Sequence, residues 1–286
     1  MRLVSFGPVG QERLGALLGN GERIVDLNKA DGSIPSKMLA FLRGDFWASA
    51  KRILADTGKV APAATVERSA VRLGAPVPRP GLIVCVGLNY KDHADEQGVE
   101  YPKAPLLFSK GPMAAVGPND DVVYPEDVQQ LDYEVELGVV IGRAAKGVSA
   151  AEAGKYIAGY CTLHDVSARC AQFGDKQWFR GKSYDTFCPF GPALVTPDEV
   201  DPSNLRLTCK VNGQVRQDSN TNNLIHGVPQ IVAHISRGIT LQPGDVIATG
   251  TPSGVGVFMK PPALLKRGDT VELEVEKLGK LVNRIV

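Results

Sequence analysis

The stretch Leu131–Gly142 (LDYEVELGVVIG) carries the clearest alternation of apolar and polar positions in the chain. Apolar side chains alternate with Glu134, Glu136 and a glycine before the run closes in apolar residues, which predicts a buried strand. Because successive strand side chains point to opposite faces, Glu134 and Glu136 share one face, roughly 7 Å apart. Two neighbouring carboxylates on a buried strand repel each other and are costly to desolvate. The pattern therefore indicates either a cation site or a strand edge that faces solvent.

Short apolar or alternating runs predict strands along most of the chain. Asn-Gly pairs at 20–21 and 212–213 stand between such runs and indicate hairpins. The predicted strands are 3–6, 15–18, 23–27, 82–86, 106–109, 160–166, 193–195 and 246–248, together with the arms of hairpins within 205–216 and 270–286.

Helical spacing is confined to a few segments. Ser36–Leu54 carries apolar residues near helical spacing, interrupted at Gly44, and this pattern predicts two short helices or one broken helix. Val228–Arg237 predicts a further helix, and an S-x-x-E capping box at 149–152 predicts one that ends near Gly159.

A proline-rich segment at 76–80 (PVPRP) indicates a stiff extended linker. We therefore expect a small N-terminal domain over residues 1–72 and a larger domain over residues 73–286. Strands do not alternate regularly with helices, which argues against a doubly wound sheet. The expected fold class is α+β, mostly β.

Composition narrows the function classes. Lys+Arg 32 against Asp+Glu 31 gives a net charge of +1, so charge does not favour a nucleic-acid or acidic-membrane partner. Five cysteines without a C-x-x-C spacing favour a reduced protein over a disulfide framework or a zinc site. The first residues hold no apolar signal-peptide core, and no apolar run reaches membrane-spanning length. We expect a soluble, cytoplasmic protein that binds neither nucleic acid nor membrane.

A third carboxylate strengthens the case for a cation. Asp165 stands at the end of the predicted strand 160–166, in the sequence LHDVSAR. With Glu134 and Glu136 it completes an all-oxygen ligand set that suits Mg²⁺ or Mn²⁺ and leaves room for a 2-oxo acid. Taken alone, Asp165 is also the kind of residue that ends a strand or forms a turn.

His93 and Glu96 have a spacing that places them on one face of a helical turn predicted over 90–97. A carboxylate paired with an imidazole orients the ring and raises its basicity, as needed to take a proton from water. The alternative is a chance pair on a solvated helix.

Further polar residues could face such a site. Lys182 is either a surface lysine or a positive charge available to an oxyanion. Arg169 and Gln172 are three residues apart on a polar stretch that could be helical. The segment 249–256 (TGTPSGVG) is rich in glycine, so its backbone can approach a ligand closely, but it lacks the G-K-[ST] of a phosphate-binding loop.

Together and in order, five motifs resemble the fumarylacetoacetate hydrolase family. They are GLNYKDHADE, DYEVELGVVIG, HDVSAR, GKSYDTFCPFGP and GDVIATGTPSGVG, spread over most of residues 81–286. The start of the chain is also similar to the small leading domain of bacterial members. The resemblance implies a mixed β-roll in the larger domain and a homodimer.

The resemblance also implies roles for individual residues. Glu134, Glu136 and Asp165 match the ligands of a Mg²⁺ or Mn²⁺ ion. The positions of His93 and Glu96 match a dyad that activates water, and Lys182 matches a lysine that assists the oxyanion. Three further positions match contacts to the pyruvyl end of the substrate: Arg169, Gln172 and Thr251.

The function expected from this resemblance is metal-dependent hydrolysis of a C–C bond in a 2,4-diketo acid of the acylpyruvate type. Such substrates include 2,4-diketo-3-deoxy sugar acids, fumarylpyruvate and maleylpyruvate, and the products are pyruvate and a carboxylic acid. Oxaloacetate decarboxylation on the same scaffold is an alternative that needs no attacking water. A non-enzymatic 2-oxo acid binding protein is a more remote alternative, which the presence of His93 and Glu96 disfavours.

Overall fold

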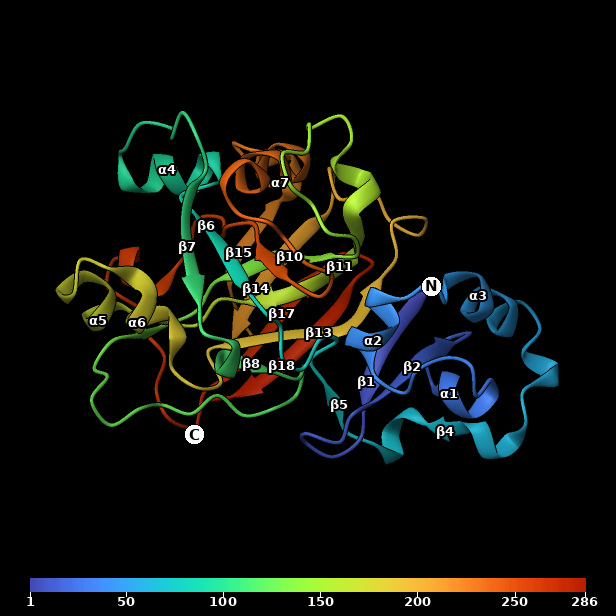
Figure 1. Ribbon diagram of the computed structural model, residues 1–286. Coiled ribbons are helices and arrows are strands. Elements are labelled where there is room, and N and C mark those ends of the chain that lie inside the picture. The colour runs from blue at the N-terminus through green and yellow to red at the C-terminus, as the bar shows by residue number, and fades with distance from the viewer.

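A single hydrogen-bonded sheet of twelve strands runs through the molecule in the computed structural model, which describes residues 1–286 (Figure 1). Its main path is β4-β3-β2-β1-β13-β11-β10-β16-β6-β7, and β5 and β8 pair with β1 and β13. The strands are β1 (Arg2–Phe6), β2 (Arg13–Leu18), β3 (Arg23–Asp26), β4 (Thr65–Glu67), β5 (Leu73–Gly74), β6 (Ile83–Gly87), β7 (Leu106–Lys110), β8 (Ala115–Val116), β10 (Val135–Ile141), β11 (Ile157–His164), β13 (Cys188–Val195) and β16 (Val246–Ala248).

Two smaller sheets and seven α-helices complete the fold. A four-stranded sheet has the order β15-β14-β17-β18, and β9 pairs with β12. These strands are β9 (Leu131–Asp132), β12 (Ser167–Ala168), β14 (Arg206–Val211), β15 (Gln214–Asn220), β17 (Thr270–Val275) and β18 (Gly279–Arg284). The helices are α1 (Leu27–Ala30), α2 (Met38–Arg43), α3 (Trp47–Ala55), α4 (Lys91–Gln97), α5 (Arg169–Gly174), α6 (Trp178–Ser183) and α7 (Val228–Gly238). No helix is both long and apolar enough to cross a membrane.

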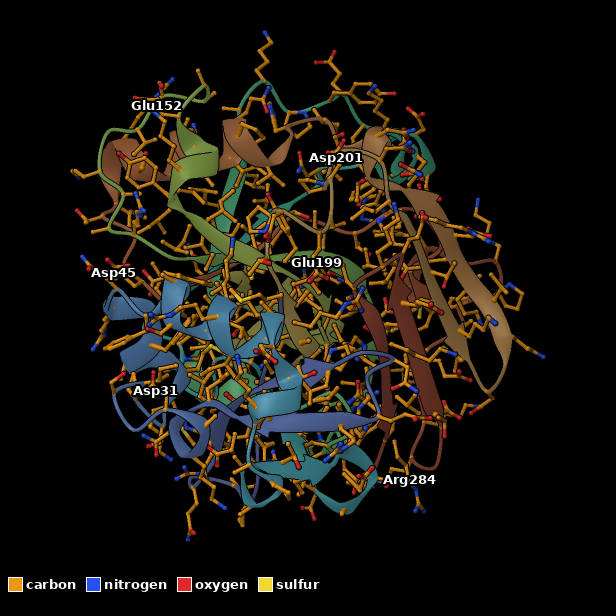
Figure 2. The ribbon with its side chains drawn as sticks, turned by 90° about the vertical axis from the view of Figure 1, so that its right-hand side faces the viewer. Asp31, Asp45, Glu152, Glu199, Asp201 and Arg284 are labelled. Carbon is orange, nitrogen blue, oxygen red and sulfur yellow. The ribbon has the colours of Figure 1, made fainter.

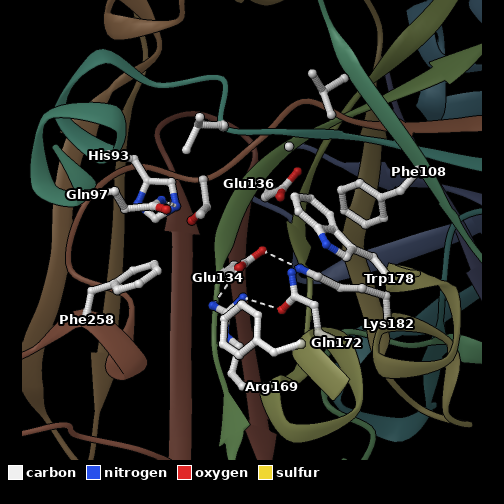
Figure 3. A pocket seen from close by; sticks show the side chains of 15 residues that line it. His93, Gln97, Phe108, Glu134, Glu136, Arg169, Gln172, Trp178, Lys182 and Phe258 are labelled. Atoms are coloured by element: carbon white, nitrogen blue, oxygen red, sulfur yellow. Dashed lines mark hydrogen bonds and ion pairs between the residues drawn. The ribbon is translucent and has the colours of Figure 1, made fainter. Parts of the chain in front are cut away.

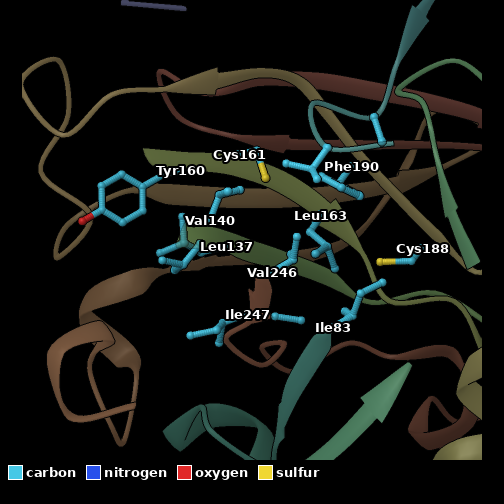
Figure 4. Close-up of a cluster of buried hydrophobic side chains, with 14 of the residues drawn as sticks. Ile83, Leu137, Val140, Tyr160, Cys161, Leu163, Cys188, Phe190, Val246 and Ile247 are labelled. Carbon is cyan, nitrogen blue, oxygen red and sulfur yellow. The ribbon is translucent and has the colours of Figure 1, made fainter. Parts of the chain in front are cut away.

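The core is built from the apolar side chains of the strands at the centre of the large sheet. Most strands here are buried along their whole length, and their apolar side chains interdigitate, as Figure 4 shows for residues of β6, β10, β11, β13 and β16. All five cysteines are free thiols. The expected α+β class with more strand than helix is confirmed.

Several local predictions are confirmed. The Asn-Gly pairs lie in the β2–β3 and β14–β15 hairpins. Helices α2 and α3 are separated at Gly44, where an added Cβ would lie 2.2 Å from the ring of Phe46. Helix α7 begins at Val228, as expected.

The prediction of one continuous strand over 131–142 is wrong. Leu131 and Asp132 pair with β12, whereas the chain from Val135 onward pairs with β11 and β16. The strand is interrupted where the backbone changes partners, and Glu134 falls in the gap, its carbonyl accepting a hydrogen bond from the Asp165 amide at 3.0 Å. This break sets Glu134 directly beside Asp165.

The helix predicted to follow the capping box is also wrong. Ser149 and Glu152 do contact each other at 3.3 Å, but only the single 3₁₀ turn Ala153–Tyr156 follows them. Gly159 lies inside β11, since pairing with β10 on one side and β13 on the other draws these residues into the sheet.

The N-terminal elements form a body at one side of the molecule and are joined to the rest through the sheet (Figure 1). Strand β1 pairs with β13, with Arg2 opposite Val195. Arg2 also forms an ion pair with Glu199, in the loop after β13 that faces the viewer in Figure 2. The division into domains 1–72 and 73–286 stays a prediction.

The sheet contacts of Gly159 generate a stability prediction. An alanine Cβ there would lie 2.4 Å from the carbonyl oxygen of Val195, in a backbone that is paired on both sides. Gly159→Ala is expected to lower the free energy of unfolding by about 1–3 kcal/mol, measured by urea denaturation. Gly154→Ala is the control, because nothing lies within 4 Å of its Cβ position. Equal stability of the two variants would contradict the packing described here.

Candidate active site

Three carboxylates meet in the interior at the ends of two strands. Glu134 lies between β9 and β10, Glu136 lies in β10, and Asp165 follows β11. One oxygen of each lies within 4.8 Å of the others, and all three side chains are buried. Figure 3 shows Glu134 and Glu136 in the wall of a pocket.

Three buried cationic side chains surround this triad. The ammonium group of Lys182, from α6, donates to Glu134 at 2.7 Å and to Asp165 at 2.8 Å. Lys110, the last residue of β7, contacts the other oxygen of Asp165 at 2.5 Å. The guanidinium of Arg169, from α5, lies 2.7 Å from the other oxygen of Glu134.

These neighbours set the ionisation of the cluster. Burial acts to raise the pKa of Glu134, but the charges of Lys182 and Arg169 outweigh it and lower that pKa to about 2. Glu136 has no cation in direct contact, so its burial and the charges of Asp165 and Glu134 raise its pKa well above the ordinary value. Burial acts to lower the pKa of Lys182, yet Asp165 and Glu134 raise it overall.

The donor set fits a divalent cation with a preference for oxygen ligands. One carboxylate oxygen of Glu136 accepts a hydrogen bond from the Gly250 amide at 2.7 Å. The other oxygen has no hydrogen-bond partner in the protein. A cation between the three carboxylates would remove the repulsion that raises the pKa of Glu136. The buried acidic triad is therefore consistent with the expected divalent metal site, and the choice between Mg²⁺ and Mn²⁺ stays open.

Asp132 holds the guanidinium of Arg169 in position. Its carboxylate accepts from the Arg169 guanidinium at 2.9 Å and from the amides of Gly256 and Val257 at 2.7 and 3.0 Å. Arg169 in turn donates to the side-chain oxygen of Gln172 at 2.9 Å. This leaves the amide nitrogen of Gln172 without a partner beside the cavity.

The loop after β16 brings its backbone against β10. Gly250 has a φ of +104°, and an added Cβ would lie 2.8 Å from the Asn89 side chain, so only glycine allows its amide to reach Glu136. Thr251 lines the cavity, and its hydroxyl donates a hydrogen bond to the carbonyl of Val135 at 2.9 Å. The hydroxyl hydrogen is therefore not available to a ligand.

His93 stands across the cavity from Lys182 (Figure 3). Its Nδ1 lies 3.1 Å from Glu96, whose second oxygen accepts from the Gly254 amide at 3.0 Å. Its Nε2 lies 2.9 Å from the amide nitrogen of Gln97. The ring of Phe258 is tilted against it with centroids 6.0 Å apart.

These groups enclose a cavity of about 80 Å³. Its wall has a polar part, made by the triad and its cations, and an aromatic part, where Trp178 and Phe108 form an edge-to-face pair. The polar part brings together seven residues expected from the sequence: His93, Glu134, Glu136, Arg169, Gln172, Lys182 and Thr251. Asp165 and Glu96 do not line the cavity, but each contacts a residue that does.

The sequence reasoning missed four residues that build this site: Asn89, Gln97, Lys110 and Asp132. Lys110 could have been noticed as a charge that ends an apolar strand, and Asp132 as a third acid next to the E-x-E pair. Asn89, which donates to the carbonyls of Thr249 and His226, gave no signal beyond its place beside the H-x-x-E motif.

Removal of Lys110 tests the charge balance. Lys110→Met leaves one oxygen of buried Asp165 without its cation, and we expect the metal-free protein to lose about 3–5 kcal/mol of unfolding free energy. Lys280→Met, which breaks a partly exposed pair with Glu272, is expected to cost less than about 1 kcal/mol. Urea unfolding in EDTA measures both, and similar losses would show that Lys110 does not compensate Asp165.

Glu136→Gln separates stability from cation binding. The substitution removes a repelling charge, so the metal-free protein is expected to be as stable as the native sequence or more so. The native protein should gain about 2.7 kcal/mol at a Mg²⁺ or Mn²⁺ concentration one hundred times the dissociation constant, and the variant should lose most of this gain. Glu274→Gln, on the exposed side of β17, is the control. Full metal stabilisation of the Glu136 variant would remove it from the ligand set.

Known proteins are similar to this chain over its whole length. The family model described as fumarylacetoacetate (FAA) hydrolase C-terminal matches residues 82–286. The chain is 48% identical to oxaloacetate tautomerase FAHD2A, mitochondrial, from Bos taurus, with 100% of this chain and 92% of that protein covered. It is 44% identical to the fumarylacetoacetate hydrolase domain-containing protein 2 homolog from Dictyostelium discoideum, with 100% and 97% covered.

Solved structures are also similar to this chain over its whole length. Fumarylacetoacetate hydrolase from psychrophilic Exiguobacterium antarcticum has a TM-score of 0.85 at 36% identity, with 100% of this chain and 99% of that chain covered. Maleylpyruvate hydrolase from Sphingobium sp. SYK-6 has a TM-score of 0.82 at 32% identity, with the same coverage. Tautomerases and hydrolases thus share this fold and the reaction class differs among them, but the chain itself belongs to the fumarylacetoacetate hydrolase family of enzymes.

Proposed function

We propose that the protein is a divalent-metal-dependent enzyme that interconverts the keto and enol forms of a small 2-oxo diacid such as oxaloacetate. The observation that carries this proposal is the small cavity beside the buried acidic triad. The relatives named oxaloacetate tautomerases, which match the chain over its full length at up to 48% identity, support the same reading.

Cavity size favours a short substrate. At roughly 10–15 Å³ for each water-sized probe, a volume of about 80 Å³ gives room for several heavy atoms beside the triad. A four-carbon diacid suits this space better than the sugar acids expected from the sequence.

The charges of the buried cluster favour the binding of an anionic substrate once a divalent cation is bound. The cluster combines four carboxylates, including Asp132, with the three cations Lys110, Arg169 and Lys182, so with every group ionised it carries one negative charge in excess. A divalent cation held by Glu134, Glu136 and Asp165 would reverse that sign and supply a Lewis acid for the carboxylate and 2-oxo oxygens. Arg169 and Lys182 would then place positive charge beside the oxygen that gains electrons.

Tautomerisation moves one proton at an oxygen and one at a carbon, and the protein offers a group for the proton at carbon. In the ketonisation direction the enol O–H bond breaks and its proton passes to solvent water, its electron pair forms the C2 carbonyl, and the C2–C3 π pair binds a proton at C3. In the reverse direction C3 loses that proton. His93, oriented by Glu96, is the titratable group of the cavity wall suited to exchange a proton at C3.

Hydrolysis of an acylpyruvate is the second candidate. The contact of His93 with Glu96 at 3.1 Å is the arrangement that activates water, and maleylpyruvate hydrolase is among the similar structures. Oxaloacetate decarboxylation needs the same anion-stabilising groups and is separated from both by its product. The homodimer and the cytoplasmic location expected from the sequence stay predictions, and the Bos taurus relative is named mitochondrial.

Substrate assays distinguish these reactions. The decay of the ultraviolet absorbance of enol oxaloacetate should accelerate with the protein and Mg²⁺ or Mn²⁺, and EDTA should abolish the effect. Pyruvate release, coupled to lactate dehydrogenase, would be followed from oxaloacetate and from acylpyruvates. Pyruvate release from acylpyruvates without accelerated enol decay would replace tautomerisation with hydrolysis, and release from oxaloacetate alone would indicate a decarboxylase.

His93→Gln tests the proton-transfer role. Loss of the imidazole is expected to slow turnover by about 10²- to 10⁴-fold, with metal stabilisation unchanged because His93 is not one of the triad. His234→Gln on α7, outside the cavity, is the control and should retain activity. Undiminished turnover in the His93 variant would assign the proton transfer to another group.

A further inference from the structure

Both ring nitrogens of His93 are held by neighbours on its own helix. Nδ1 lies 3.1 Å from a carboxylate oxygen of Glu96, and Nε2 lies 2.9 Å from the amide nitrogen of Gln97 (Figure 3). The amide of Gly254 fixes Glu96 in this position at 3.0 Å. The imidazole therefore cannot present a free nitrogen to a substrate without a change in one of these contacts.

The chemistry of the partners assigns the ring protons. An ionised carboxylate only accepts hydrogen bonds, so Nδ1 carries the hydrogen that faces Glu96. In the neutral ring Nε2 then has a lone pair and accepts from the Gln97 amide. The nitrogen that has to take up a proton is thus covered by Gln97.

Gln97 has the freedom to uncover it. Its side chain lines the cavity, is only half-buried, and has no hydrogen-bond partner in the protein other than His93. A carboxylate accepts hydrogen bonds more strongly than a neutral imidazole, because the bond is charge-assisted. The ring takes only one of the two amide hydrogens of Gln97, and a carboxylate at this end of the cavity that accepts both of them turns the amide away from Nε2.

We propose, resting on the proposed function, that Gln97 is a positioning residue that makes the base available only to a diacid. The carboxylate of the substrate farthest from its 2-oxo group accepts the amide hydrogens of Gln97, and Nε2 of His93 is released to exchange a proton at C3. A monoacid of the same series lacks this second carboxylate and leaves Nε2 covered. Gln97 thereby selects 2-oxo diacids at the proton-transfer step.

Nitrogen NMR of the histidine rings tests the release without turnover. The chain has four histidines, so ring-labelled protein gives few signals, and His93→Gln identifies the one of interest. In the Mg²⁺-loaded protein, the unreactive 2-hydroxy diacid malate should shift the Nε2 resonance of His93 toward that of a nitrogen without a donor. Lactate, the corresponding monoacid, should leave it in place. No difference between malate and lactate would overturn the proposal.

The variant Gln97→Met removes the amide but keeps the length of the side chain. Its Nε2 resonance should already be that of an uncovered nitrogen, with or without malate. Gln230→Met, an exposed glutamine on α7 that does not line the cavity, is the matched control and should behave as the native protein. A native-like Nε2 resonance in Gln97→Met would show that Gln97 does not cover the ring.

Catalysis gives the second readout. The ratio of kcat/KM for oxaloacetate enolisation to that for deuterium exchange at the methyl group of pyruvate should fall by about tenfold or more in Gln97→Met, the loss expected for one charge-assisted hydrogen bond. An unchanged ratio in an active protein would overturn the proposal. Failure of the native protein to enolise either acid, with the malate-specific NMR shift still present, would remove the proposed function and retain the role of Gln97.

Discussion

The balance between buried acids and buried bases is the constraint on which this structure depends. Glu134, Glu136 and Asp165 could not remain together in the interior without Lys110, Lys182 and Arg169 around them. The compensation is uneven, since Glu136 has no cationic partner. With Asp132 counted, the cluster holds one carboxylate more than it holds cations, and a divalent ion would offset that excess and create an anion site.

The fold supplies this balance from elements far apart in sequence. The acids come from two adjacent strands, the cations from the end of β7 and from two short helices, and the acid–base pair from α4. The loop after β16 connects the two halves of the site, because its amides bind Glu136 at Gly250 and Glu96 at Gly254. A ligand that displaces this loop would disturb the metal ligands and the base together.

Much of the fold and site could be predicted from sequence because local signals were consistent there. The hairpins, the break at Gly44 and the three acids each follow from period and turn chemistry acting over a few residues. The interruption at Glu134 could not be predicted, since it depends on which strands the chain pairs with on either side. Gln97 escaped notice for a related reason: a glutamine on a short polar helix has no pattern of its own, and its role comes from the neighbour it contacts.

The pairing of β1 with β13 makes the N-terminal segment part of the large sheet. Leu194 and Val195, in the strand beside the one that delivers Asp165, take their outer hydrogen bonds from residues Arg2 and Leu3. A chain beginning after residue 72 would keep every residue of the candidate site, yet it would carry an open apolar sheet edge of the kind that recruits other strands. Self-association through that edge, rather than loss of the chemistry, would then limit such a fragment.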